Sequence, residues 1–470
     1  MVRKLDRTAA ALAGAMIVVR AISLVGRPLW FDEIFTEWIS RQSLTKIVQH
    51  LRLDSGPPLF YALSLPFVRA GERLHFDPAA RLLSFGALAL LFVAFGPRYS
   101  GGRRFAVLLA SSPLIFFYSG EARPYALLSA VSFALFLAAV RAPDTRRSRV
   151  VAALSAAVLP WIHYLGLFVV AGSVILCAIR KRWGLAALQA AAASLFLAWL
   201  PVAIDQPPLS IAWNFSSDSP ALRAPQAFGF WGGLPAYFSA WRPPAAWAGI
   251  ALGFAILLAA LAAARKSSAV RGALAFSLLP LALVAAANFF RPVYFPGRTE
   301  MATLPVALWA FARASRRSAA VNLLTLVAAG AGLAGIAFSV LSPAGPFPYS
   351  ETAKFLAARS KPGDLLVAAD ANYLPLRLKR DRGEVRARLI GLPEEIESHP
   401  GWFEPSPASR IDAEQARIRQ EIAAVPAGGR IDFAIPPDAA LRDLAQRSLG
   451  NQRRRVLQPP GGYAILEADR

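Results

Sequence analysis

The sequence predicts an α-helical polytopic membrane protein of about eleven transmembrane helices, followed by a small C-terminal α/β soluble domain. Three observations predict this class. Of the 470 residues, 56% are hydrophobic and only 17% are charged, which is too little charge to cover the surface of a globule. Apolar stretches of the length that crosses a bilayer, about 20 residues, recur through residues 1–344. Nearly all of the net charge of +22 lies in that same part, whereas the tail, 345–470, is close to neutral.

Composition also excludes other classes of protein. The chain is too apolar for a disordered protein, and its single cysteine, Cys177, excludes a disulfide scaffold. A basic soluble protein of this size usually binds nucleic acid, but such a protein spends many surface positions on charge. We therefore expect no nucleic-acid partner.

Eleven stretches of the first part are candidate spans. Residues 150–163 are short for a span, and their boundary with the next stretch is the least certain, so that spans could merge or split there. The candidates are residues 8–26, 79–97, 104–119, 124–141, 150–163, 164–180, 184–204, 245–264, 272–290, 299–313 and 318–341.

The placement of charge orients these spans. With the N-terminus inside, the inside connections hold nineteen cations and two acids, while the outer face and the spans share thirteen cations and ten acids. This is the positive-inside asymmetry, repeated at every inside loop. Because the number of spans is odd, the C-terminal domain is expected outside, in a multi-pass protein of the inner (plasma) membrane with a cytoplasmic N-terminus.

The remaining features follow from this topology. We read residues 8–26 as a retained span rather than a signal peptide, because Arg20 interrupts the apolar stretch and no small-residue cleavage site follows. Residues 57–72 are too short for a span and predict an interfacial helix. Two long outer loops are expected, at 27–78 and 205–244, and the second has few structure signals.

The tail, 345–470, reads as a soluble extracytoplasmic domain. A helix is predicted at Glu351–Arg359, and the turn at Pro362-Gly363 leads to a strand at 364–368. Further strands are predicted at 430–435 and 463–466, with helical stretches between them. The tail shows no nucleotide-binding loop and no metal-ligand spacing.

Acidic residues are rare in the membrane part, and most of them lie in outer loops near the ends of spans, where they carry information about function. A carboxylate can deprotonate an acceptor, arginines can hold a phosphate, and walls between spans can hold a lipid tail. Together, a carboxylate, arginines and an apolar groove predict an enzyme in which an acceptor attacks a sugar that is carried by a lipid phosphate. The polar residues that reach the outer face are Asp32, Glu33, Asp54, Glu121, His163, Tyr164, Arg291 and Arg298.

Each of these residues also has a simpler interpretation. The pair Asp32 and Glu33 could belong to a solvated loop, and Glu121 could form a structural ion pair with Arg123. A histidine at a helix junction, as at 163, is more often a satisfied polar residue than a ligand, and Arg298 could be an ordinary flanking charge. Spacing alone leaves these alternatives open.

The order of the motifs resembles the GT-C superfamily of integral membrane glycosyltransferases. Trp-Phe-Asp-Glu follows the first span, then come Pro-Pro-Leu-Phe-Tyr from Pro57, Glu-Ala-Arg-Pro-Tyr from Glu121, and His163-Tyr164. Arg298 follows, with a proline seven residues later. The branch it looks most like is glycosyltransferase family 39 and its relatives, the protein-mannosyltransferase and aminoarabinose-transferase-like group. The resemblance covers about residues 1–340.

The resemblance implies an activity. Members of the family move a sugar from a polyprenyl monophosphate to an acceptor by one inverting displacement, on the extracytoplasmic side. Asp32 would then be the general base, with Glu33 as its catalytic neighbour. The phosphate of the donor would be bound by Arg298, together with Arg123 and Arg291. Five residues would line the cavity: Asp54, Glu121, Tyr125, His163 and Tyr164.

Two positions depart from the family pattern, since Gly56 stands where relatives often carry His or Lys before Pro-Pro, and Thr299 stands where a tyrosine commonly follows the late arginine. Some members use a divalent metal and others do not, so the sequence assigns neither a metal nor another cofactor. The expected partners are the polyprenyl-phosphate-sugar donor, an acceptor that is a glycan, lipid or protein, and the membrane.

Two other classes of function compete with this one. A polytopic transporter or flippase of a lipid-linked or anionic substrate usually places ionisable groups near mid-membrane and has repeated halves. The sequence shows neither feature. A structural assembly protein would need the tail for a partner outside and would tolerate the loss of Asp32 and Glu121.

Overall fold

The computed structural model describes residues 7–25, 27–92, 102–207, 226–233, 243–290, 293–341, 347–400, 411–450 and 452–470. The predicted class is confirmed: the chain is mostly helical, with a small five-stranded sheet near its C-terminus. It divides into two compact units. One comprises 1–26 and 55–343, and the other comprises 27–54 and 344–470.

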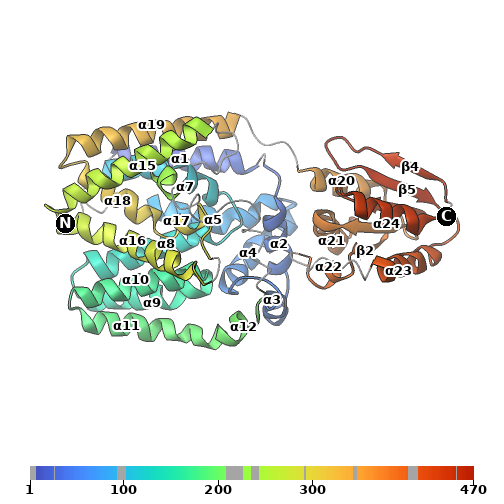
Figure 1. The fold of residues 1–470 in the computed structure, drawn as a ribbon, viewed down its shortest axis with the longest axis horizontal. Helices are drawn as coiled ribbons and strands as arrows, with labels where there is room; N and C mark the ends of the chain where they lie inside the picture. The colour runs from blue at the N-terminus through green and yellow to red at the C-terminus, as the bar shows by residue number, and fades with distance from the viewer. Residues whose placement is uncertain are drawn as a thin grey trace. The chain divides into compact units, whose positions relative to one another are not determined.

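The first unit is entirely helical over its described residues (Figure 1). Over its described residues, each of the eleven predicted stretches coincides with one helix or with two or three consecutive helices. The elements are α1 (Arg7–Val25), α4 (Leu59–Leu74), η1 (Asp77–Arg81), α5 (Leu82–Leu90), α6 (Gly102–Ala110), α7 (Pro113–Ser119), α8 (Tyr125–Phe136), η3 (Leu137–Arg141), α9 (Arg146–Ile162), α10 (Leu165–Ile179), α11 (Trp183–Ala193), η4 (Ser194–Trp199), α12 (Leu200–Asp205), α14 (Gln226–Trp231), α15 (Pro243–Ala264), α16 (Ser268–Ala287), α17 (Arg298–Met301), α18 (Leu304–Ala314) and α19 (Ala319–Leu341).

Several of these helices are built to cross a membrane. Among the described residues, four helical segments are long and apolar enough, namely Trp183–Asp205, Trp247–Ala264, Ser268–Ala287 and Ala319–Leu341. Shorter apolar helices occupy Gly14–Val25, Tyr125–Arg141, Leu165–Ile179 and Leu304–Ala314. The chain is therefore an integral membrane protein.

Local sequence explains where the helices break. The stretch 104–119 divides at Ser111 and Ser112, because Pro113 begins α7 and the Ser112 hydroxyl accepts the Ile115 N–H at 3.4 Å. The uncertain boundary near 163 is a true break: α9 ends at Ile162 and α10 begins at Leu165. Gly166 permits the tight crossing there, since a Cβ at this position would lie 2.2 Å from the Leu159 carbonyl oxygen.

The core of this unit lies where α8, α16 and α18 meet. The ring of Phe136 packs edge-on against Phe276 and against Trp309, at centroid distances of 5.5 and 5.3 Å. All three side chains are fully buried. Aromatic side chains of this size contribute the largest apolar areas to such a core.

The second unit is a three-layer α/β domain that also contains two helices from the N-terminal part of the chain. Its elements are α2 (Phe31–Ser40), α3 (Leu44–Leu51), α20 (Pro348–Arg359), β1 (Leu365–Ala369), η6 (Asp370–Asn372), α21 (Tyr373–Asp381), β2 (Arg388–Leu392), α22 (Glu395–Ser398), α23 (Ile411–Ala423), β3 (Arg430–Ala434), α24 (Ala439–Leu449), β4 (Arg454–Leu457) and β5 (Ile465–Asp469).

The sheet has the order β2-β1-β3-β5-β4. Strand β1 pairs in parallel with β2 and β3, and β5 pairs antiparallel with β3 and β4. Helices α20, α21 and α22 cover one face, and α23 and α24 cover the other. The strands β1, β3 and β5 overlap the three predicted ones. Strands β2 and β4 were not predicted: β4 is an exposed edge strand rich in arginine, and Gly391 interrupts β2.

Helices α2 and α3 pack on the C-terminal part of this unit. The ring of Phe35 lies 5.5 Å from the ring of His399, and His50 lies 6.3 Å from the same ring. Glu37 forms an ion pair with Arg382, at the end of α21. Part of the predicted outer loop 27–78 is therefore an integral piece of the second unit. Of the other predicted loop, 205–244, residues 208–225 and 234–242 lie outside the described residues.

The contact between α3 and the domain predicts a dependence of stability on pH. Burial, with the nearby charges of His399, Arg377 and Lys46, lowers the pKa of His50 from 6.5 to about 4. Between these two pH values the unfolded chain binds a proton that the folded chain does not, so acidification from pH 6.5 to 4 should favour unfolding. We expect a His50→Phe variant to lose less thermal stability over this range than the natural protein. Equal pH slopes for the two proteins would contradict the prediction.

Candidate active site

The candidate residues of the first unit converge at the helix ends where α8, α10 and α17 begin. The Tyr125 ring lies 5.3 Å from the His163 ring, and the Arg298 guanidinium lies 5.6 Å from the centre of the Tyr125 ring. The positive charges of Arg123 and Arg298 both act on the His163 ring. Three motifs that are far apart in the sequence thus form one cluster.

The backbone defines how His163 is oriented. It ends α9 in an extended conformation, and its Nδ1 accepts the backbone N–H of Leu165 at 3.1 Å. The proton of the neutral ring therefore lies on Nε2, which makes that nitrogen a donor. A neutral donor beside two arginines suits an anionic ligand.

A buried turn holds Arg298 in place. Gly297, with a φ of 81°, allows the turn, and the carboxylate of Glu300 closes it by accepting the Gly297 N–H at 2.6 Å and the Tyr294 hydroxyl at 2.7 Å. The Ser129 hydroxyl of α8 donates to the Met301 carbonyl and ties α17 to α8. Glu300 was not singled out from the sequence. Its signal was an acid three residues after a glycine, in a chain segment with few acids.

Removal of this carboxylate should loosen the turn. We expect Glu300→Gln to lower the free energy of unfolding by about 1–3 kcal/mol, because the amide cannot accept both buried hydrogen bonds. The midpoint of thermal unfolding of the purified protein measures this loss. Glu351→Gln is the matched control, since its partner in the ion pair, Lys354, is 60% exposed, and such a pair at the surface should contribute little. A shift no larger than that of the control would contradict the assignment.

The second outer motif is held by a buried arginine of the first helix. Glu121 is only 1% exposed and Arg20 only 3%. Arg20 donates to the Phe117 carbonyl at 2.8 Å and packs against Gly120, where a Cβ would lie 1.5 Å from its nitrogen. The sequence marked Arg20 only as an interruption of an apolar span. A charge within such a span is itself a signal of a functional or structural role.

Tyr164 points into a different network. Its hydroxyl donates to the Gln206 side chain at 2.6 Å and accepts the Trp199 N–H at 3.0 Å. The Gln206 amide donates in turn to the Gly56 carbonyl at 3.1 Å, just before the Pro-Pro pair. Tyr164 therefore links the end of α12 to the Pro-Pro segment. Arg291 lies outside the described residues.

The remaining candidates belong to the second unit. Asp32 is partly exposed in the first turn of α2, whereas Glu33 is fully buried and accepts the Trp30 N–H at 3.2 Å. The Glu33 carboxylate thus caps its own helix. Asp54 is also buried, in the turn after α3.

Tyr349 of α20 is a residue of this region that the sequence did not indicate. Its ring meets that of Phe31 edge-on at 6.3 Å. Burial and the negative charges of Asp32 and Glu33 raise the pKa of the Tyr349 hydroxyl above its usual range. Tyr349 therefore stays protonated and lies within electrostatic reach of Asp32.

No metal site is evident from the described residues, in which no group of three His, Cys, Asp or Glu side chains lies close enough to hold an ion. The cluster of arginines and aromatic rings in the first unit is instead suited to an anion, since guanidinium groups form paired hydrogen bonds with phosphate.

The composition and the apolar helices define an integral membrane protein, and its fold is shared with solved structures. The solved structures that share this fold include ArnT from Cupriavidus metallidurans bound to undecaprenyl phosphate, with a TM-score of 0.57, 14% identity and coverage of 97% of each chain. The apo structure of the same protein matches with a TM-score of 0.56, at the same identity and coverage. No protein family profile matches the chain, and no curated protein matches it.

Proposed function

We propose that the protein is a membrane glycosyltransferase that moves a sugar from a polyprenyl-monophosphate donor to an acceptor on the extracytoplasmic side. One observation carries this proposal: the guanidinium of Arg298 is held over the Tyr125 ring, beside His163 and within a rigid turn. A fixed cation in a partly buried setting is suited to an anion whose charge grows during reaction. The solved relative with undecaprenyl phosphate bound shares the fold, which supports a polyprenyl phosphate as the anion.

The reaction is a single displacement. A hydroxyl or amine of the acceptor attacks the anomeric carbon of the sugar, and the bond from that carbon to the phosphate oxygen breaks. The electron pair leaves with the polyprenyl phosphate, whose charge Arg298 stabilises, with Arg123 and Arg291 as further cations. The acceptor proton passes to the Asp32 carboxylate, which is partly exposed, whereas Glu33 is buried and caps its own helix. Inversion at the anomeric carbon follows from one displacement.

The other candidates have supporting roles in this proposal. His163 donates from Nε2 to the phosphate or to the sugar, and Tyr125 forms the aromatic wall under Arg298. Glu121, Asp54 and Tyr164 shape the cavity. The tail and the loop 205–244 control access of the acceptor.

The proposal is tested by incubating the purified full-length protein with a panel of polyprenyl-phosphate sugars and candidate acceptors. Mass spectrometry should detect free polyprenyl phosphate and a glycosylated product of inverted configuration. The rival class is tested in parallel by uptake of the same donors into sealed vesicles. Uptake without any covalent product would overturn the proposal in favour of a transporter.

A further inference from the structure

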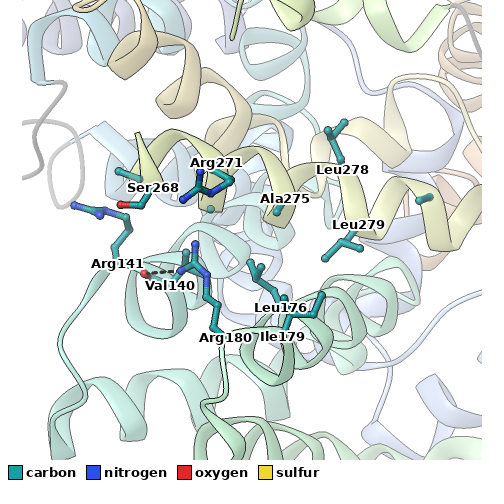
Figure 2. A pocket seen from close by; sticks show the side chains of 13 residues that line it. Val140, Arg141, Leu176, Ile179, Arg180, Ser268, Arg271, Ala275, Leu278 and Leu279 are labelled. Carbon is teal, nitrogen blue, oxygen red and sulfur yellow. Dashed lines mark hydrogen bonds between the residues drawn. The ribbon is translucent and has the colours of Figure 1, made fainter. Parts of the chain in front are cut away.

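A cavity lined by arginines lies at the other end of the same helices. This cavity, of about 690 Å³, opens between η3, α10 and α16, and it is lined by thirteen residues (Figure 2). Arg141 ends the helical segment that begins at Tyr125, and Arg180 follows the end of α10, which begins two residues after His163. At 1.5 Å per residue these segments separate the cavity from the Tyr125 cluster by about 20–25 Å. The cavity is therefore distinct from the candidate active site.

Three arginines from three different elements gather at one end of this cavity: Arg141, Arg180 and Arg271. Figure 2 shows them together, with Leu278 and Leu279 toward the opposite end. No acidic residue is among the described residues that line the cavity. The charges of Arg141, Arg182 and Arg271 all act unfavourably on the Arg180 cation. The folded chain thus concentrates positive charge where an external anion would relieve the repulsion.

The packing of α10 on α16 determines the position of the Arg180 side chain. Its guanidinium occupies the space left by the missing side chain of Gly272, where a Cβ would lie 2.1 Å from the Arg180 nitrogen. Arg180 also donates to the Val140 carbonyl at 3.4 Å. The close packing of α10 on α16 continues further along the helices, where Gly172 lies against Pro280.

Apart from Ser268, the rest of the cavity lining is apolar, and part of it is exposed at the surface of this unit. Leu176, Ile179, Ala275, Leu278 and Leu279 form its walls, and Ile179 is 69% exposed. Helix α16 is one of the segments long and apolar enough to span a membrane. An opening on such a helix faces the acyl chains of lipids rather than water. Arginines near a helix end, above an apolar groove, fit a phosphate that carries a hydrocarbon tail.

We infer that this cavity binds an anionic phospholipid, with the headgroup phosphate on Arg141, Arg180 and Arg271 and an acyl chain along the apolar wall of α10 and α16. The predicted topology places these arginines at the cytoplasmic leaflet. The inference does not depend on the transferase activity, because binding can be measured without a donor or an acceptor.

The test uses the purified full-length protein and native mass spectrometry with phosphatidylglycerol and phosphatidylcholine as probes. We expect the natural protein to retain phosphatidylglycerol at least tenfold more strongly than phosphatidylcholine. The double variant Arg180→Gln/Arg271→Gln should lose this preference. Arg316→Gln/Lys266→Gln is the matched control, because it removes two exposed cations that do not line the cavity, and it should keep the preference. Equal retention of the two lipids by the natural protein would overturn the inference.

A second variant separates a lipid from a free anion. Ala275→Phe fills the apolar wall and leaves all three arginines in place. Retention of phosphatidylglycerol should fall severalfold in this variant. If retention is unchanged, or if inorganic phosphate at millimolar concentration displaces the lipid completely, the site takes a free anion and the lipid assignment is wrong. Thermal unfolding of each variant without lipid checks that it is folded, and the conservative pair Arg180→Lys/Arg271→Lys provides a further folded variant that should keep part of the preference.

Discussion

Replacement of Asp32 by asparagine is expected to lower the rate of sugar transfer by about 10²- to 10⁴-fold, the range that a positioned general base contributes. Asparagine keeps the shape of the side chain but cannot take up the acceptor proton. The backbone carbonyl of Asp32, which accepts the Thr36 hydroxyl at 2.9 Å, is unchanged, so α2 should remain folded. Initial rates of product formation measure the effect, and thermal unfolding confirms an intact protein.

Asp144→Asn is the matched control for this experiment. It also removes one carboxylate, from an ion pair with Arg149 in which both side chains are about half exposed, and such pairs contribute little to stability. The control should transfer sugar at the natural rate. If Asp32→Asn did so as well, Asp32 would not be the base, and Tyr349 and Glu33 would be the next residues of this region to replace.

Replacement of Arg298 by methionine should lower kcat/KM by about 10²- to 10³-fold, as the loss of one preorganised donor to a developing oxyanion does. We expect most of the loss in kcat, because the charge on the departing phosphate is greatest in the transition state. Arg298→Lys should recover only part of the rate, since an ammonium group lacks the paired hydrogen bonds of guanidinium. Free polyprenyl phosphate should also inhibit the methionine variant less strongly than the natural enzyme.

The control here is Arg146→Gln, which removes an exposed cation from the start of α9, at the end of the bundle away from the Tyr125 cluster. Its kinetic constants should not change. If Arg298→Met raised KM and left kcat unchanged, the arginine would bind the donor equally in the ground state and the transition state. An unchanged kcat/KM would remove Arg298 from the site.

The helices could be predicted from the sequence because a long apolar stretch in lipid has few other ways to satisfy its backbone polar groups. The positions at which the helices break were harder to predict from the sequence. Pro113 and Pro305 carry a local signal for a helix start, but the break at His163 depends on how Gly166 packs against Leu159. The strands of the tail were likewise predictable only where their sequence is apolar. The buried β1 and β3 were predicted from their apolar runs, whereas β4, with two arginines, was not.

The candidate site was predictable only in part, for a related reason. Tyr125, His163 and Arg298 each follow a break between apolar segments, so their arrival at one end of the bundle follows from the alternation of spans. Glu300 and Arg20 act through contacts with residues far away in sequence or in an adjacent turn, which no spacing displays. Tyr349 belongs to a separate region of the chain and meets Phe31 only after the second unit has folded.

The inclusion of α2 in the second unit has a consequence for biosynthesis. Phe35, Trp38 and Ile39 are buried in the finished protein, and Phe35 packs on His399, more than 350 residues later in the chain. A ribosome synthesises the tail last, so α2 must wait through the insertion of nearly every membrane helix before its partner exists. During that interval the apolar face of the helix with Asp32 has no partner from the tail. A chain that ends before the tail should therefore be a substrate for chaperones and proteases, even where its membrane helices are complete.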